Sequence, residues 1–383
     1  MLPGLLAPVL AVVGLLVVAA ISFGLLGGTL PTLPGGGGGP VRTATPSNVV
    51  IIDPRANVPG SLVYVKAGNI WIQAGAKATQ LTTGGKDAMP TWSADGQWIY
   101  FVRYTSESGR FPISGQIKTF DLRTPTLERM HPDGSAIAAI LNGHFSRGRF
   151  DWSFFIRQPS MSPDGKTAAI ITDGPDPTRS DLVLKFVDIA TGSIKNPQLA
   201  DIFGLGHQDP AWSPDGKSLL FVRDARLGAH GAATIERYDL ATKRTTTLTG
   251  PGYIAPAWSP DGRYVAATKT DTLGTDIVIL DARTGAELLR LTSDKGSFDA
   301  VWSPIGDAIA FFRTDQGVID LQVVRLAGTA PAWTIGDTFA LTLSAGLDAT
   351  SHPSWWVPAN LIPKPTSPLP TLRPAGSPGA TTH

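Results

Sequence analysis

The sequence contains no cysteine. This absence excludes disulfide bonds, cysteine metal sites, a cysteine nucleophile and lipid attachment at cysteine, but it leaves the compartment open. An excess of charge is also missing, because the 383 residues carry a formal net charge of +1. Phosphate backbones are bound by clustered Lys and Arg, so nucleic acid is not predicted as a partner.

Long hydrophobic runs are equally scarce. After a short N-terminus of residues 1–4, only residues 5–26 are apolar throughout, interrupted by Pro8, Gly14, Ser22 and Gly24. As a helix, this segment would span about 33 Å, which is enough for a bilayer core. We predict a transmembrane anchor or signal sequence that associates with the membrane. A cleaved signal peptide stays open, because Ala20-Ile21-Ser22 loosely resembles a cleavage site.

Glycine and proline, in contrast, are abundant, with 42 and 32 residues. Residues 27–60 contain five consecutive glycines, Gly35 to Gly39, between prolines, so we expect a flexible linker there. Residues 358–383 hold seven prolines and few charges, so we expect a disordered tail. Between these two segments, short apolar runs separated by turn residues predict an all-β domain over residues 61–357.

One phrase recurs through that domain. It reads Trp258-Ser-Pro-Asp-Gly262, and it returns at Trp212 and Trp92, more loosely at Met161 and Trp302, and in frayed form at Trp355. Most intervals between these markers are roughly 45–55 residues, the length of a four-stranded propeller blade. The first interval, from Trp92 to Met161, is longer by about 20 residues.

The two ends of the repeat region complete each other. Three strands near residues 62–65, 69–72 and 79–82 have no first strand before them, whereas residues 352–357 form a first strand with nothing after it. We therefore predict a six-bladed β-propeller of four-stranded blades, with the last blade closed by strands from both termini. Such closure hides sheet edges that would otherwise pair with other chains.

The residues of the phrase suit a turn rather than a catalytic site. Proline presets φ, aspartate bonds its own backbone, and glycine accepts a positive φ before the next strand. The tryptophan supplies a large surface for packing between blades. We therefore assign structural roles to the repeated Trp and Asp residues: Trp92, Trp212, Trp258, Trp302, Trp355, Asp95, Asp164, Asp215 and Asp261.

The phrase resembles the TolB-type propeller repeat, also called the PD40 or WD40-like repeat, over nearly all of residues 61–357. Proteins similar in this way include periplasmic members of the Tol system and the propeller domains of prolyl-oligopeptidase-type peptidases. The sequence differs from both, since no α/β segment flanks its repeats. The resemblance implies the fold and says little about the function.

The orientation at the membrane rests on two opposing signals. No Lys or Arg precedes residues 5–26, and Arg42 and Arg55 follow them, which by the positive-inside rule favours a cytoplasmic C-terminal side. A propeller behind an N-terminal hydrophobic segment is, however, usually exported. We expect the propeller to lie outside the cytoplasm, in a periplasmic or extracellular location.

Catalytic motifs are missing. The sequence has no Gly-x-Ser-x-Gly elbow, no His-x-x-x-His pair and no phosphate-binding glycine loop after a strand. The carboxylates of residues 173–181 lack EF-hand spacing, so a polar loop is expected there. No cofactor and no metal site are predicted.

Two candidate sites remain. The first consists of the residues three positions before each marker, where the chain enters each first strand: Met89, Gln158, Asp209, Ala255, Asp299 and His352, with His207 and Arg157 close by in sequence. If these side chains converge at the channel mouth, Gln158, Asp209, Asp299, His352, His207 and Arg157 form a polar funnel for a ligand, an ion or a peptide end. An ordinary water-filled channel is the alternative.

The second candidate is the insertion before Met161. It carries Phe145, Arg147, Arg149, Phe150 and Trp152, and aromatic and Arg side chains are the usual anchors of protein interfaces. Alternatively, its aromatic residues pack against their own blade as an extra strand. Together these features predict a membrane-tethered module that binds a protein or peptide without catalysis. The competing hypothesis is a hydrolase or lyase with a small polar or metal site at the channel mouth.

Overall fold

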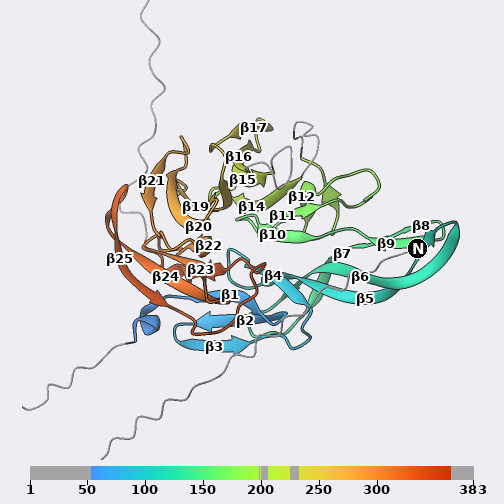
Figure 1. Cartoon of the computed structure of the whole chain (residues 1–383), viewed down its shortest axis with the longest axis horizontal. Coiled ribbons are helices and arrows are strands. Elements are labelled where there is room, and N and C mark those ends of the chain that lie inside the picture. Colours follow the sequence, from blue (N-terminus) through green and yellow to red (C-terminus); the bar gives the residue numbers. More distant parts are fainter. Residues whose placement is uncertain (1–52, 198, 200–205, 225–232, 364–383) are drawn as a thin grey trace, which may run out of the picture. The chain divides into compact units, whose positions relative to one another are not determined.

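Residues 53–197, 199, 206–224 and 233–363 are described by the computed structural model, and these residues form six four-stranded antiparallel sheets and one two-stranded sheet. The sheets lie around a common centre (Figure 1). The expected six-bladed, all-β propeller is confirmed. Residues 5–26 lie outside the described residues. Among the residues that the structure describes, no helix is long and apolar enough to cross a bilayer.

Blades one to three consist of the following strands, from the innermost outward. Blade one has β26 (Ser354–Trp356), β1 (Ser61–Lys66), β2 (Asn69–Ala74) and β3 (Lys77–Gln80); blade two has β4 (Asp87–Trp92), β5 (Ile99–Ile113), β6 (Gln116–Met130) and β7 (Ala138–Asn142); blade three has β10 (Arg157–Met161), β11 (Thr167–Thr172), β12 (Val183–Asp188) and β13 (Ile194–Lys195).

Blades four to six follow in the same order. Blade four has β14 (His207–Trp212), β15 (Ser218–Arg223), β16 (Thr234–Asp239) and β17 (Arg244–Thr247); blade five has β18 (Tyr253–Trp258), β19 (Tyr264–Asp271), β20 (Gly274–Asp281) and β21 (Glu287–Arg290); blade six has β22 (Ser297–Trp302), β23 (Ala308–Asp315), β24 (Val318–Thr329) and β25 (Ala332–Ala340).

Strands from both ends of the domain close the ring, as predicted. Strand β26 pairs antiparallel with β1, and Leu62 faces Trp355 in that register. The Trp355 indole donates a hydrogen bond of 2.9 Å to the Pro59 carbonyl. Just outside the closure, the chain forms two short 3-10 helices, η1 (Pro54–Asn57) and η3 (Ala359–Leu361), within the segments expected to be linker and tail. Residues 27–52 and 364–383 of these segments lie outside the described residues.

The hydrophobic core lies between neighbouring blades. Second strands are buried on both faces, as at Phe101, Phe221 and Phe311. One core cluster joins Ile279 of blade five to Trp302 of blade six, and the other clusters combine adjacent blades similarly. Each sheet therefore has two apolar faces, and the ring shape gives each face a neighbour to pack against.

The repeated phrase forms the turn between the first two strands of blades two to six. In blade five, Ser259 Oγ donates to Asp261 at 2.6 Å and accepts the Tyr264 amide at 2.9 Å. Gly262 has a φ of 69°, which supports a role in the turn. The same bonds recur around Asp95, Asp164 and Asp215. These carboxylates are occupied by their own turns.

The fourth strand of blade one ends at Gln80, earlier than the predicted strand of residues 79–82, and a threonine follows the fourth strand in several blades. Thr82, Thr249, Thr292 and Thr342 follow the last paired residues, and each hydroxyl accepts a third-strand amide at 2.9–3.0 Å. The Thr hydroxyl thus replaces a backbone carbonyl as the acceptor, while the carbonyl of the same third-strand residue accepts the amide of the preceding Leu at 2.8 Å. This pair of bonds explains the recurring Leu-Thr at these positions.

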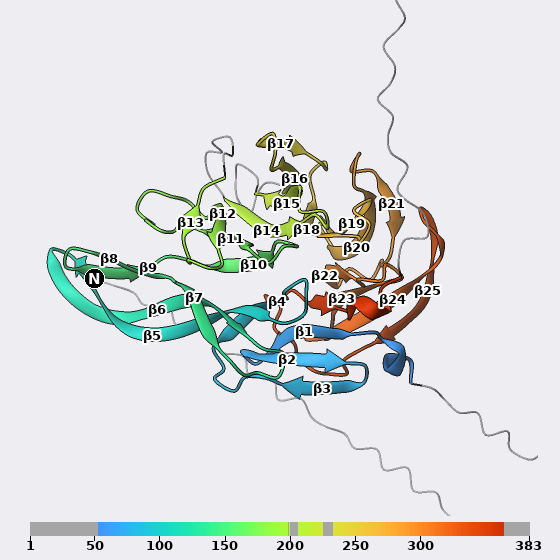
Figure 2. The same cartoon turned by 180° about the vertical axis from the view of Figure 1, so that it is seen from behind.

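The long interval after Trp92 is built differently from the expectation. Two features share the excess: the 15-residue strands β5 and β6, which remain paired to Ile113↔Gln116, and a separate hairpin of β8 (His144–Arg147) and β9 (Phe150–Ser153). We define the arm as residues 104–125, which form the outer part of the β5–β6 hairpin, together with β8 and β9. In both views the arm runs out beyond the other strands of its blade (Figures 1 and 2).

Candidate functional site

The six residues three positions before each marker share one unusual backbone conformation. Each has a positive φ although none is glycine: Met89 (53°), Gln158 (50°), Asp209 (49°), Ala255 (48°), Asp299 (52°) and His352 (37°). In five blades the pairing between first and second strand shifts register at this residue, as in a β-bulge. A bulge turns a side chain away from its regular alternation, and left-handed non-glycine residues are costly unless the fold holds them.

The shared kink directs all six residues into one cavity at the centre of the ring. Its volume is about 140 Å³, and prolines follow five of the six residues around its wall: Pro90, Pro159, Pro210, Pro256 and Pro353. Proline has no amide to pair with the next strand, so it suits a bulge. The X-Pro pair before Trp-Ser is therefore a sequence signal for this ring.

Three ionisable side chains meet in the cavity. His352 lies between two carboxylates, with Nδ1 3.3 Å from Oδ2 of Asp299 and Nε2 3.4 Å from Oδ1 of Asp209. Asp299 and Asp209 are nearly buried, whereas about a third of the His352 side chain is exposed to the cavity. The structure thus brings together residues from blades one, four and six.

Gln158 completes this group from blade three. Its side-chain amide donates to Asp209, and its Oε1 accepts the Asp209 amide at 3.1 Å. Nε2 of Gln158 also lies 3.3 Å from Nε2 of His352. The Gln158 amide can donate a hydrogen bond to this ring nitrogen only when the nitrogen carries no proton. Asp209 Oδ2 also accepts the Ala255 amide at 3.0 Å. When Nε2 of His352 is protonated, the acceptor within reach is Oδ1 of Asp209, at 3.4 Å.

The environment shifts the pKa of both central groups. The pKa of Asp299 is raised to about 6, mainly by burial, with His352 lowering it and the nearby Asp209 raising it. Burial alone would lower the pKa of His352, but Asp299 and Asp209 outweigh that effect and raise it. A carboxyl group whose pKa is shifted this strongly in a cavity is typical of functional sites.

His207, predicted to join the funnel, lies elsewhere. It is buried between blades three and four, where Nδ1 accepts the Leu184 amide at 3.0 Å and the ring packs edge-on against Phe221. Burial lowers its pKa to about 4, so it is neutral and structural. Arg157 does not line the cavity either, although its charge acts on His352 by lowering that pKa. Both residues precede the kink, and the cavity is lined by the kinked residues and those that follow them.

One supporting residue could not have been found from the sequence. The Thr268 hydroxyl, fully buried on β19, accepts the Asp299 amide at 3.0 Å and so holds the kink of blade six. Thr268 stands 31 residues before Asp299, in the neighbouring blade. No local pattern marks such a contact.

The aromatic insertion packs against its own blade. Phe145 and Trp152 face each other across β8 and β9 with ring centroids 4.6 Å apart, and Phe111 of β5 meets Trp152 edge-on at 5.8 Å. Phe150 lies 6.2 Å from Phe111. Arg147 bonds Thr178 at 3.2 Å, whereas Arg149 is exposed. The insertion is thus both an extra pair of strands and a carrier of exposed side chains.

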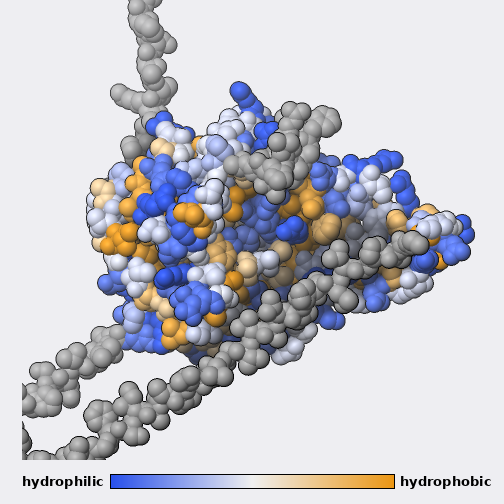
Figure 3. All heavy atoms as spheres, viewed as in Figure 1, coloured by the Kyte–Doolittle hydropathy of each residue, from blue (hydrophilic) through white to orange (hydrophobic). Residues whose placement is uncertain are grey.

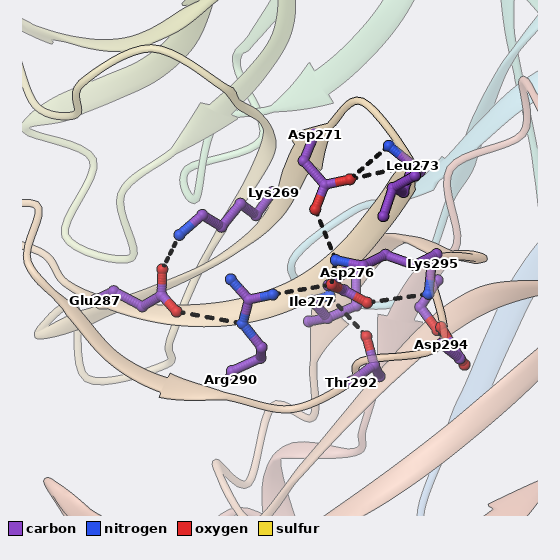
Figure 4. Close-up of polar contacts among 12 residues, drawn as sticks. Lys269, Asp271, Leu273, Asp276, Ile277, Glu287, Arg290, Thr292, Asp294 and Lys295 are labelled. Atoms are coloured by element: carbon purple, nitrogen blue, oxygen red, sulfur yellow. Dashed lines mark hydrogen bonds and ion pairs between the residues drawn. The ribbon is translucent and has the colours of Figure 1, made fainter.

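A second group of charges, in blade five, has a structural role (Figure 4). Asp276 is buried and accepts Lys295 Nζ at 2.7 Å and Arg290 Nη1 at 3.0 Å. Its other oxygen accepts the Lys295 amide at 3.1 Å, which fixes the chain between blades five and six. Asp271 and Glu287 complete this network at the blade surface. Every charged side chain in this network is paired with another one, so none is left unpaired to bind a ligand.

The channel-mouth cavity is suited to binding a cationic group or to proton transfer. Two carboxylates face one imidazole, so the group carries net negative charge when all three are ionised. Within the described part of the chain, no set of three or more His, Asp or Glu side chains is arranged to hold a metal ion. The two nitrogens of His352 each face a carboxylate rather than a common point, which is consistent with that finding.

No protein-family model matches the sequence. The chain is 30% identical over 153 residues to the uncharacterized protein Atu1656 of Agrobacterium fabrum (strain C58 / ATCC 33970), which covers 38% of this chain and 43% of that protein. The match thus spans less than half the length of this relative.

Solved structures show the fold. TolB from Acinetobacter baumannii is 18% identical with a TM-score of 0.55, covering 77% of this chain and 66% of that one. A putative TolB from Agrobacterium tumefaciens is 19% identical with a TM-score of 0.55, covering 78% and 94%. A chain of a nidogen/laminin complex is 11% identical with a TM-score of 0.54, covering 78% and 98%. This chain has the TolB-like β-propeller fold.

Proposed function

We propose that this TolB-like propeller is a membrane-tethered module outside the cytoplasm that binds a protein or peptide partner and performs no catalysis of its own. One observation carries the binding part of the proposal. Six left-handed residues from six blades line a single cavity, and they bring Asp209, Asp299 and His352 together there. Backbone strain repeated in every blade at one ring supports a role for that ring beyond folding.

The chemistry of the cavity favours a cationic group on the partner. Two nearly buried carboxylates attract an ammonium or guanidinium group, which they can bind by charge-assisted hydrogen bonds. The volume of about 140 Å³ accommodates a chain terminus or a side-chain end rather than a folded segment. A peptide with a free N-terminal amine, or with a protruding Lys or Arg, fits these limits.

Binding can be tested with defined peptides and with envelope extracts. The full chain and its Asp299→Asn variant are compared with Asp337→Asn, which changes an exposed carboxylate on β25 outside the cavity. Peptides with free and acetylated N-termini are the probes. We expect free-amine or basic peptides, and specific envelope proteins, to be retained by the wild type and Asp337→Asn and lost by Asp299→Asn. Equal retention by all three proteins, or no specific retention at all, would overturn the proposal.

The tether and the orientation have their own test. The sequence lacks cysteine, so a single Leu343→Cys change on an exposed position introduces a unique label site. A membrane-impermeant maleimide should label this cysteine in intact cells, and the protein should resist alkaline extraction from membranes. Labelling only after lysis would contradict the orientation, and release by alkali would contradict the anchor at residues 5–26.

A second candidate function is a hydrolase or lyase acting at the same cavity. The observation that favours it is the pKa of Asp299 near 6 beside an imidazole, a pairing suited to general acid–base work. Metal analysis and an activity screen of the wild type and Asp209→Ala test this function. Turnover that Asp209→Ala abolishes would support the enzyme, whereas no metal and no activity would exclude it.

A further inference from the structure

The arm presents a tip with apolar residues on both faces. Strands β5 and β6 stay paired as far as Ile113↔Gln116, but β4 accompanies β5 only to Arg103. Near the tip, Phe111, Ile113 and Ile117 are each 41–45% exposed. Side chains alternate along a strand, so Phe111 and Ile113 project from one face and Ile117 from the other. Such a tip is suited to entering an apolar phase more than to lying on a flat protein surface.

Cationic side chains lie on the arm near this tip. Arg110, Lys118, Arg147 and Arg149 are all exposed. Arg110 precedes Phe111 and Lys118 pairs with it across β5 and β6, whereas Arg147 and Arg149 belong to the β8–β9 hairpin. The carboxylate of Asp151 is largely buried and bonds Arg110 at 2.9 Å. Over the whole arm, five Arg and Lys residues against Glu107, Asp121 and Asp151 give a charge of +2, while the whole chain carries +1. Figure 3 shows hydrophobic and hydrophilic residues side by side at this end.

Not all of these cations are neutralised within the protein. Arg147 lies 3.9 Å from Asp176 of blade three, a loose pair. Lys118 and Arg149 form no ion pair among the described residues. Aromatic side chains of the β8–β9 hairpin, Phe150 and Trp152, lie half-buried behind the tip. Basic residues around an apolar and aromatic end match the chemistry of an anionic lipid surface.

We infer that the end of the arm inserts into an anionic membrane surface, with Phe111, Ile113 and Ile117 among the acyl chains and Lys118 and Arg149 on the lipid phosphates. The contact is separate from the channel-mouth cavity and from residues 5–26. It gives the propeller a second hold on the bilayer and fixes how its blades face the membrane.

A fluorescent label at the tip tests this contact in the full chain. Ile113→Cys is the only cysteine after substitution, and Val318→Cys places the same label on the corresponding hairpin of blade six, where Val318 is 37% exposed. Each labelled protein is mixed with phosphatidylcholine vesicles, or with vesicles of equal parts phosphatidylcholine and phosphatidylglycerol. We expect the tip label alone to shift to the blue and to resist aqueous acrylamide, and only with the anionic vesicles.

The charged residues are tested in the same assay. Lys118→Gln with Arg149→Gln removes two phosphate contacts at exposed positions. We expect the ratio of inserted to free tip to fall roughly thirtyfold, because each basic residue near the surface contributes about 1 kcal/mol. Equal quenching of the two labels in anionic vesicles overturns the inference, as does failure to bind them. Protection of the tip without lipid, growing with protein concentration or after addition of envelope extract, also overturns it and assigns the tip to another copy or a protein.

Discussion

Nδ1 of His352 lies 3.3 Å from Oδ2 of Asp299. The two residues belong to different blades and stand at equivalent positions in them, three before Trp355 and Trp302. Each reaches the other because both backbones are left-handed at that point. A repeated local kink has therefore produced a pair that no single blade contains.

Replacing Asp299 with Asn should change how stability depends on pH. The pKa of Asp299 is raised by burial to about 6 in the folded chain, so its stabilising effect is complete below the unfolded value near 4 and is lost as pH rises through 6. Asn cannot ionise, so the Asp299→Asn variant does not lose this stability as the pH rises. From pH 4 to pH 7 the stability of Asp299→Asn should therefore rise relative to the wild type by on the order of 2–3 kcal/mol.

Urea denaturation at a series of pH values measures this difference. Asp337→Asn, exposed on β25, is the control and should follow the wild type at every pH. A constant offset between Asp299→Asn and the wild type would show that the carboxyl of Asp299 does not titrate in this range.

Binding of a cationic peptide should weaken in acid. Protonation of Asp299, with its pKa of about 6, removes one of the two carboxylates that face the cavity. The affinity should fall about tenfold from pH 7.5 to pH 5.0, if the ionised form binds. Titration calorimetry of the wild type at several pH values is the measurement. Asp299→Asn should bind weakly with little pH dependence, and a pH response retained in that variant would assign the effect to another group.

Closing the ring should depend on Gly60. Its φ is 69°, and a Cβ built there would lie 2.0 Å from the Trp356 carbonyl oxygen of β26. Gly115 at the tip of the arm also has a positive φ, 78°, but nothing lies within 4 Å of its Cβ position. Gly115→Ala should cost only about 1 kcal/mol of backbone strain. Gly60→Ala carries the same strain and a backbone clash, so it should cost several times more.

Thermal unfolding of the two variants separates strain from clash. If Gly60→Ala and Gly115→Ala unfold at similar temperatures, the pairing of β26 with β1 does not govern the stability of the propeller.

Loss of the Asp276 carboxylate should destabilise blade five, and only above acidic pH. Burial raises its pKa, but hydrogen bonds and charges from Lys295 and Arg290 outweigh burial and lower it. Its contribution is therefore present above the unfolded value near 4 and is lost as pH falls through the lower folded value. Since both cations are partly exposed, Asp276→Asn should cost about 1–2 kcal/mol at pH 7.

The measurement is denaturant unfolding at pH 7 and near pH 2. Asp271→Asn is the matched control, because Asp271 pairs with the same Lys295 from an exposed position and should matter less. Equal costs for the two variants, or a cost for Asp276→Asn that persists near pH 2, would contradict the structural role assigned to Asp276.

The sequence by itself determined the number of blades, the closure of the propeller by strands from both ends of the domain, and the positions of the kinked residues that line the cavity. Ser-Pro-Asp-Gly is a local turn whose hydrogen bonds span at most five residues, so its copies count the blades without any tertiary contact. The kink stands at a fixed distance before that turn, which is why Gln158, Asp209, Asp299 and His352 could be named in advance. Closure followed from strands missing at one end and left over at the other.

Only the tertiary structure decided which residues near the kinked positions take part in the cavity site. His207 is two residues from Asp209, yet the bulge changes the side-chain direction between them and leaves His207 in the core. Thr268 supports Asp299 across a blade boundary. The length of the arm was likewise hidden, because β5 and β6 stay paired by contacts between residues up to 31 apart. Turn signals are local, whereas pairing across strands and blades depends on which distant surfaces the closed ring brings together.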